Sequence, residues 1–198
     1  MVSSFAHRQL NGMNDPPNVH VRPLRRSEIP LITAYWNTAS DADLLAMGID
    51  LDDIAVLADL PERLHAQLAK APPERDVEVL VALLEGRAMG HCYVNAIRYG
   101  LDACLHLHVW SPGARRRGLG TRMVAAALPH FFETLALQYL ICEPASANPA
   151  PNRALEKLGF ELEKCYETIP AGWNFVLEVN RWVFTRAQLE LRYPPGVP

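Results

Sequence analysis

The stretch Trp110–Met123 reads WSPGARRRGLGTRM, and it joins an apolar run with strand-like alternation to an apolar run with helical spacing. Within it the three arginines Arg115–Arg117 lead directly into Gly118 and Gly120. A helix that begins after such a loop exposes backbone N–H groups whose partial positive charge attracts anions, and glycine lets an oxygen approach the main chain closely. The stretch therefore predicts a strand–loop–helix unit that binds a phosphorylated ligand, with a solvated basic turn as the alternative.

The composition is that of one globular domain, with 198 residues of which 49% are hydrophobic and 21% charged. The net charge of −3 makes the arginine run a local feature and disfavours nucleic-acid binding, which is typical of basic domains. No apolar run has the roughly 18 residues of a membrane span, and the N-terminus lacks the order of a signal peptide. The cysteines form no CxxC pair, which predicts free thiols, no metal site and a cytoplasmic protein. They are Cys92, Cys104, Cys142 and Cys165.

Hydrophobic periodicity predicts alternating strands and helices. The chain is expected to form one α+β domain over 19–186, between a flexible tail at 1–18 and a C-terminal tail at 187–198. Pro129 is expected to kink or end the helix that follows the arginine loop, and Gly159 to end a later short helix. The predicted strands are 19–24, 76–86, 87–100, 101–110, 137–144, 160–169 and 174–186, and the predicted helices are 25–39, two pieces within 41–71, 120–136 and 150–158.

The spacing Arg115-x-x-Gly118-x-Gly120 resembles the Arg/Gln-x-x-Gly-x-Gly/Ala motif of the GCN5-related N-acetyltransferase (GNAT) superfamily. A second segment, Asn148–Phe160, reads NPAPNRALEKLGF and resembles the Asn-rich short helix of the ribosomal-protein and siderophore-type branch. The order of elements over 19–185 is also similar to that of the family. The resemblance implies a layered α/β/α fold with about four helices and a mixed, mostly antiparallel sheet of about seven strands. Strands 4 and 5 of that sheet are expected to splay apart.

The resemblance implies direct transfer of an acyl group from acetyl-CoA to a primary amine of a small molecule or a protein N-terminus. It implies a monomer or homodimer and no metal, nucleic-acid or membrane partner. For Asn148 a helix N-cap is the alternative role. A non-catalytic acyl-CoA-binding or sensing module is the alternative function, and RNA binding through the arginines is a remote third. The implied CoA-binding residues are Val109, Trp110, Arg115, Arg116, Arg117, Gly118, Leu119, Gly120, Thr121, Asn148 and Asn152.

Candidate catalytic residues lie near the ends of the two strands expected to splay. His106 and His108 share one face of the first strand with Trp110, and a histidine there is a candidate for contacting the acceptor or accepting its proton. Glu143 ends the second strand after an apolar run, where partial desolvation would make it a stronger base. The alternatives are core histidines, and a Glu143 that pairs with Arg153 or caps the next helix.

The chain departs from the family motif at the position of the usual general acid. Leu155 stands where many members carry a tyrosine, and Pro151 replaces the serine of the branch motif. Tyr166 and Tyr139 are the candidate substitutes, and a water is the alternative. The acceptor is not identified: an acidic cluster would favour a cationic amine or form a solvated helix face, and residues 173–175 would line a pocket or fill a hairpin. The acidic cluster consists of Asp41, Asp43, Asp50, Asp52 and Asp53.

Overall fold

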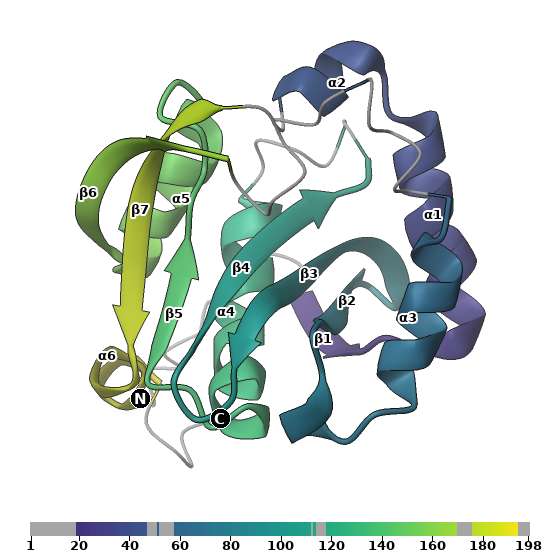
Figure 1. The fold of residues 1–198 in the computed structure, drawn as a ribbon, viewed down its shortest axis with the longest axis horizontal. Coiled ribbons are helices and arrows are strands. Elements are labelled where there is room, and N and C mark those ends of the chain that lie inside the picture. The colour runs from purple at the N-terminus through teal and green to yellow at the C-terminus, as the bar shows by residue number, and fades with distance from the viewer. Residues whose placement is uncertain are drawn as a thin grey trace, which may run out of the picture.

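The computed structural model describes residues 19–46, 51, 58–111, 113, 118–169 and 176–193. Within these ranges seven strands form one sheet in the order β1-β2-β3-β4-β5-β7-β6, which confirms the predicted α+β fold (Figure 1). The strands are β1 (Val19–Pro23), β2 (Glu78–Leu84), β3 (Arg87–Arg98), β4 (Asp102–Val109), β5 (Tyr139–Cys142), β6 (Glu161–Thr168) and β7 (Leu177–Thr185). The described helices number six where about four were expected: α1 (Ile29–Thr38), α2 (Asp41–Ala46), α3 (Leu60–Leu68), α4 (Leu119–Thr134), α5 (Pro149–Leu158) and α6 (Arg186–Arg192).

The pairing of β4 with β5 is parallel, whereas every other neighbouring pair in the sheet is antiparallel. Its last pair joins Cys104 to Ile141. Beyond that pair β4 continues to Val109 along β3 without pairing with β5. The expected splay of the fourth and fifth strands is therefore confirmed.

Two apolar layers cover the two faces of the sheet. On one face α4, α5 and α6 bury side chains against the strands, and Phe131 and Phe132 of α4 are fully buried. On the other face α1, α2 and α3 pack over the N-terminal half of the sheet (Figure 1). Because side chains of a strand alternate between faces, Leu105 points toward α4 while His106 points to the α1 side. This alternation decides which polar groups of β3 and β4 meet.

Two segments near the ends of helices differ from the sequence prediction. Pro129 does not end α4, which continues to Thr134, because the buried Phe131 and Phe132 bind its last turns to the core despite the missing N–H donor. Residues 187–192, expected in a tail, belong to α6. Thr185 caps that helix by accepting a hydrogen bond from the backbone N–H of Gln188. Gly159 does end α5 in the left-handed conformation, as expected.

The four cysteines are all free, as the sequence predicts. Burial raises the pKa of Cys92 to about 12, and it also raises the pKa of Cys104 to about 12. Thiols with such values stay protonated at neutral pH and react slowly. None of the described helices is long and apolar enough to cross a membrane.

Candidate active site

The site is built around the opening between β4 and β5. At its closed end the thiol of Cys142 donates to the carbonyl oxygen of Leu105 at 3.2 Å. In an antiparallel strand pair, alternate residues turn their N–H and C=O groups to opposite sides. Leu105 thus turns toward β5, and Val109 shares its orientation. The backbone of Trp110 faces the other way, toward β3, because its N–H donates to the carbonyl oxygen of Met89 at 3.0 Å. The resemblance to the family implies that the main chain of Val109 and Trp110 binds CoA, and of these two residues only Val109 is oriented toward the opening.

The expected anion-binding loop leads into α4. Gly118 caps this helix with a φ of 72°, and as glycine it has no side chain to accept a bond from the first turn. A left-handed φ favours glycine, so Gly118 is required for its conformation. The first N–H groups of α4 have no partner within the helix, which suits an anion. Arg115, Arg116 and Arg117 lie outside the described residues.

Gly120 has a packing role in addition to the one that its motif suggests. A Cβ added there would lie 3.1 Å from Cδ2 of Leu107, which is tighter than ordinary packing. Glycine at this position therefore lets α4 approach β4, and the approach of a phosphate oxygen, for which the sequence also predicts glycine, stays a prediction. Leu119 is buried in the core and Thr121 is half-buried. The contribution of these residues to an anion site would come from their backbone N–H groups.

Aromatic and imidazole rings form a continuous cluster on the α1 side of β3 and β4. His108 stacks on His91 with ring centroids 4.8 Å apart, and its Nδ1 lies 3.3 Å from the hydroxyl of Tyr35. Only 8% of His108 is exposed. His108 is therefore a core residue, which is the alternative that the sequence left open. The aromatic cluster consists of Tyr35, Trp36, His91, Tyr93, His106, His108 and Trp110.

His106 lies at the end of the aromatic cluster that is closer to β5. Its Nε2 is 2.9 Å from Oδ1 of Asn95, and since an amide oxygen only accepts, Nε2 carries the proton and Nδ1 keeps its lone pair. Burial lowers the pKa of His106 to about 4, although the charge of Glu143 acts in the opposite direction. At neutral pH the imidazole is uncharged, and its Nδ1 can accept a hydrogen bond.

His91 is a second buried, neutral imidazole. The indole Nε1 of Trp110 donates to its Nδ1 at 2.8 Å, so this nitrogen is unprotonated. Burial, with a smaller contribution from His106, lowers the pKa of His91 to about 3. Both imidazoles are thus held in their neutral form by the fold.

These two histidines predict that the folded state is sensitive to acid. A histidine in an unfolded chain has a pKa near 6.5, whereas His106 and His91 in the folded protein have pKa values of about 4 and about 3. Between these values the unfolded state binds more protons than the folded state. Stability therefore falls as the pH drops from about 7 toward 4. We expect each histidine to cost about 2 kcal/mol of the free energy of unfolding between about pH 7 and pH 5. Urea unfolding over this range measures the slope.

The replacement His106→Gln should remove about half of that slope, because one of the two groups no longer titrates. His65→Gln is the matched control, since His65 is exposed on α3. If His106→Gln and His65→Gln give the slope of the unchanged protein, His106 is not a buried neutral imidazole.

Glu143 lies at the β5 side of the opening with a side chain that is 15% exposed. Its Oε1 accepts hydrogen bonds from Nη1 of Arg181 and from the hydroxyl of Tyr166, both at 2.6 Å. The partner of Glu143 is thus Arg181 of β7, and not Arg153, which was the alternative from the sequence. In the described part of the chain no group donates to Oε2 of Glu143, so one carboxylate oxygen remains to accept a proton or a hydrogen bond.

Tyr166 is the better placed of the two candidate tyrosines. Burial and the hydrogen bond to Glu143 raise the pKa of Tyr166, so it keeps its phenolic proton. Tyr139 begins β5 and pairs with Asp102, at the end of the strand opposite to Glu143. Tyr139 therefore does not belong to the site.

The two asparagines of the second motif have structural roles. Asn148 caps α5 by accepting from the N–H of Ala150 at 3.3 Å. The amide of Asn152 donates to the carbonyl oxygens of Ala145 and Asn148 at 3.0 and 2.7 Å. Its oxygen accepts from the side chains of Asn180 and Trp182 at 2.9 and 2.8 Å. These four bonds use the hydrogen-bonding capacity of the side chain, so Asn152 connects α5 with β7.

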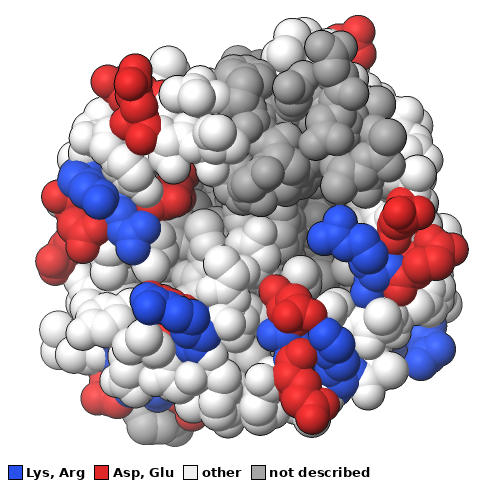
Figure 2. Space-filling view, in the orientation of Figure 1, with Lys and Arg blue, Asp and Glu red and all other residues white. Residues whose placement is uncertain are grey.

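Two cavities adjoin the face of the sheet that carries the aromatic cluster, and Asp76 lines both of them. One, of about 410 Å³, lies between α1, α3, β2 and β3. The other, of about 630 Å³, includes Glu143 and Arg181. On the face seen in Figure 2, side chains of both charges lie to the left of, to the right of and below an uncharged central area. Among the described residues no group of three or more His, Cys, Asp or Glu side chains could hold a metal ion.

The sequence did not lead to the residues that β3 contributes to the site. These residues occupy every second position of the strand, as the histidines of β4 do, and this period of two could have identified them: His91, Tyr93 and Asn95. No local signal identified Arg181 as the partner of Glu143, because the two residues lie 38 positions apart. Residues 50, 52, 53 and 173–175, which the sequence linked to the acceptor, lie outside the described ranges. Asp41 and Asp43 form the first turn of α2.

Comparison with known proteins supports this fold. A family model described as acetyltransferase (GNAT) domain matches residues 18–161. Aminoglycoside acetyltransferase AAC(6')-Ib, solved with coenzyme A, superposes with a TM-score of 0.68 at 19% identity, covering 88% of this chain and 99% of that one. The ribosomal L7/L12 alpha-N-protein acetyltransferase RimL, also with coenzyme A, gives a TM-score of 0.69 at 12% identity and 86% and 96% coverage.

The spermidine/spermine N-acetyltransferase SpeG from Vibrio cholerae gives a TM-score of 0.68 at 16% identity, covering 88% of this chain and 98% of that one. A search of curated proteins by sequence finds no match. At these identities the structural likeness establishes the fold alone. The family model spans more than half of the chain, and the protein therefore belongs to the GNAT acetyltransferase domain family.

Proposed function

We propose that the protein is an acetyl-CoA-dependent N-acetyltransferase that transfers the acyl group directly to a primary amine. The observation that carries this proposal is the parting of β4 and β5 beyond Cys104 and Ile141, with polar groups on both sides of the opening. His106 provides a neutral imidazole on the β4 side, and Glu143 provides a carboxylate on the β5 side. The bound coenzyme A of AAC(6')-Ib and RimL is consistent with this use of the fold.

The proposed CoA site runs from the opening to the start of α4. Val109 turns its main chain toward the opening, where pantetheine would pair, and the N–H groups from Gly118 to Thr121 would bind the pyrophosphate. Arg115–Arg117 would add charge-assisted hydrogen bonds to it. Asn148 and Asn152 shape the β5–α5 connection from within the protein. The free cysteines are consistent with a reducing cytoplasm.

In the proposed reaction the amine nitrogen attacks the thioester carbonyl, so that an N–C bond forms and the C–S bond breaks. Oε2 of Glu143 accepts the proton that leaves the amine, and the neutral His106 orients the amine from the β4 side. A backbone N–H of β4 polarises the carbonyl group. Tyr166, which keeps its proton, returns one to the departing thiolate. The hydrogen bond between Tyr166 and Glu143 then lets the proton on the carboxyl group replace the one donated.

The proposal is tested by thiol release from acetyl-CoA with a panel of primary amines. Amine-dependent release supports the transferase, whereas CoA binding without release from any amine supports the alternative of an acyl-CoA-binding module. That alternative is favoured by one observation, the buried Leu155 at the position of the usual tyrosine.

Replacement of Arg115 with alanine is expected to raise the Kd for CoA about 10- to 100-fold, because a charge-assisted hydrogen bond contributes roughly 1.5–3 kcal/mol. The unfolding temperature without ligand should stay unchanged. Isothermal titration with CoA measures the effect, and Arg153→Ala on the exposed side of α5 is the matched control. Equal Kd values for both variants and the unchanged protein contradict the proposed anion site.

A further inference from the structure

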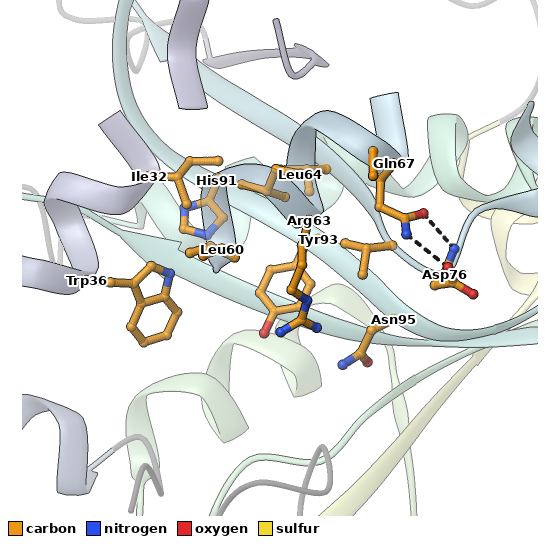
Figure 3. A pocket seen from close by; sticks show the side chains of 13 residues that line it. Ile32, Trp36, Leu60, Arg63, Leu64, Gln67, Asp76, His91, Tyr93 and Asn95 are labelled. Carbon is orange, nitrogen blue, oxygen red and sulfur yellow. Dashed lines mark hydrogen bonds between the residues drawn. The ribbon is translucent and has the colours of Figure 1, made fainter. Parts of the chain in front are cut away.

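We propose that the cavity between α1, α3, β2 and β3 binds the acceptor, and that the acceptor is an apolar α-amino acid. The proposal rests on the acetyl-transfer function above. The cavity volume of about 410 Å³ is within the range of small-molecule sites. Figure 3 shows side chains from both helices and both strands pointing into it.

One end of the cavity meets the proposed catalytic groups. Asn95 and Tyr93 both line the cavity, and both contact His106. Asn95 does so through the 2.9 Å hydrogen bond, and Tyr93 stacks on the imidazole with ring centroids 4.5 Å apart. An amine bound at this end lies beside the imidazole that we propose to orient it.

The opposite part of the cavity is apolar. Ile32 and Trp36 lie one turn apart on α1 and present one face of that helix to the cavity. Leu64 of α3 and Val79 of β2 complete these walls, and all four residues are buried in the core on this side of the sheet. Such walls favour a branched or aromatic side chain over a polar one.

The charge at the polar end selects an anion. Arg63 of α3 lines the cavity near Tyr93 (Figure 3), and its guanidinium makes no hydrogen bond or ion pair with the residues that the structure describes. Asp76, the acidic residue that lines this cavity, is already bound by Gln67 and Lys70. The guanidinium of Arg63 therefore keeps its donors for a ligand, and it attracts a carboxylate and disfavours a polycation.

An α-amino acid carries the three matching groups on one carbon atom. Its amine would face Asn95 and His106, its carboxylate Arg63, and its side chain the walls around Trp36. A polyamine or an aminoglycoside has neither the carboxylate nor the apolar side chain.

The test uses the full chain and three probes: phenylalanine, phenylalanine amide and spermidine. Isothermal titration in the presence of CoA should give phenylalanine a Kd at least tenfold lower than the other two. Arg63→Gln should abolish the preference for phenylalanine over its amide, and Arg63→Lys should retain most of it. Ala66→Trp places an indole at an exposed α3 position that lines the cavity, and it should weaken phenylalanine binding at least tenfold. Glu62→Trp, exposed on α3 but outside the cavity lining, is the matched control and should bind normally.

Thiol release from acetyl-CoA separates the two proposals. Phenylalanine that binds with these variant effects but is not acetylated, while another amine of the panel is, overturns the acceptor proposal and leaves the transferase function standing. The absence of thiol release with every amine of the panel overturns the transferase function. Acetylation of spermidine with a higher kcat/KM than that of phenylalanine supports the transferase and overturns the amino-acid proposal. Phenylalanine binding that is equal in Ala66→Trp and Glu62→Trp also overturns it.

Discussion

Replacing Glu143 with glutamine is expected to lower kcat/KM about 10²- to 10⁴-fold, the usual contribution of a positioned general base. The amide keeps the size of the side chain but cannot accept the amine proton. CoA affinity should be unchanged, because Glu143 lies beyond the end of β5 on the face opposite to α4. Steady-state kinetics with acetyl-CoA and an accepted amine measures the loss of kcat/KM, and isothermal titration with CoA measures the affinity.

The ion pair with Arg181 provides the control for a structural role of Glu143. Arg181→Met removes the same ion pair but leaves the carboxylate in place. If Glu143 accepts the proton, Arg181→Met retains most of the kcat/KM that Glu143→Gln loses. If Glu143 only holds Arg181, the two variants lose similar activity, and the assignment as a base is wrong. His108→Gln should lower stability and retain most of kcat/KM, since His108 is buried in the core.

The sequence predicts the fold well because its main signals are local. The apolar alternation in β2, β3 and β4, and the helical spacing of apolar residues after the arginine loop, can be recognised from neighbouring residues alone. The motif positions that the sequence related to CoA have more than one physical role in the structure. Gly120 allows α4 to approach Leu107. The motif gives no sign of this close contact, because Leu107 lies on β4, the strand that precedes the loop.

The candidate site is predicted less completely because its polar groups are paired across distant segments. His106 and Glu143 follow from strand alternation and position at a strand end. The partners that decide their chemistry, Asn95 and Arg181, come from β3 and β7. Only the tertiary pairing of strands brings these residues together, and a single sequence carries no local record of it.

Asn152 illustrates this limit and gives the second large effect. Asn152→Leu is expected to lower the free energy of unfolding by about 3 kcal/mol, because it leaves several half-buried donors and acceptors without partners at once. These include the indole N–H of Trp182 and the side-chain amide of Asn180. For a chain of this size the midpoint of thermal unfolding should fall by about 6–12 °C. Thermal and urea unfolding of the variant measure the loss.

Asn148→Ala is the matched control, since it removes one capping bond of 3.3 Å and should cost only about 1 kcal/mol. The two variants also separate a connecting role from a ligand role. If Asn152 chiefly bound CoA, its replacement would raise the Kd for CoA and leave the unfolding midpoint of the free protein unchanged. Because the side chain already makes four protein hydrogen bonds, we expect the reverse order: a large loss of stability without ligand, and a weaker affinity for CoA only through the displaced β5–α5 connection.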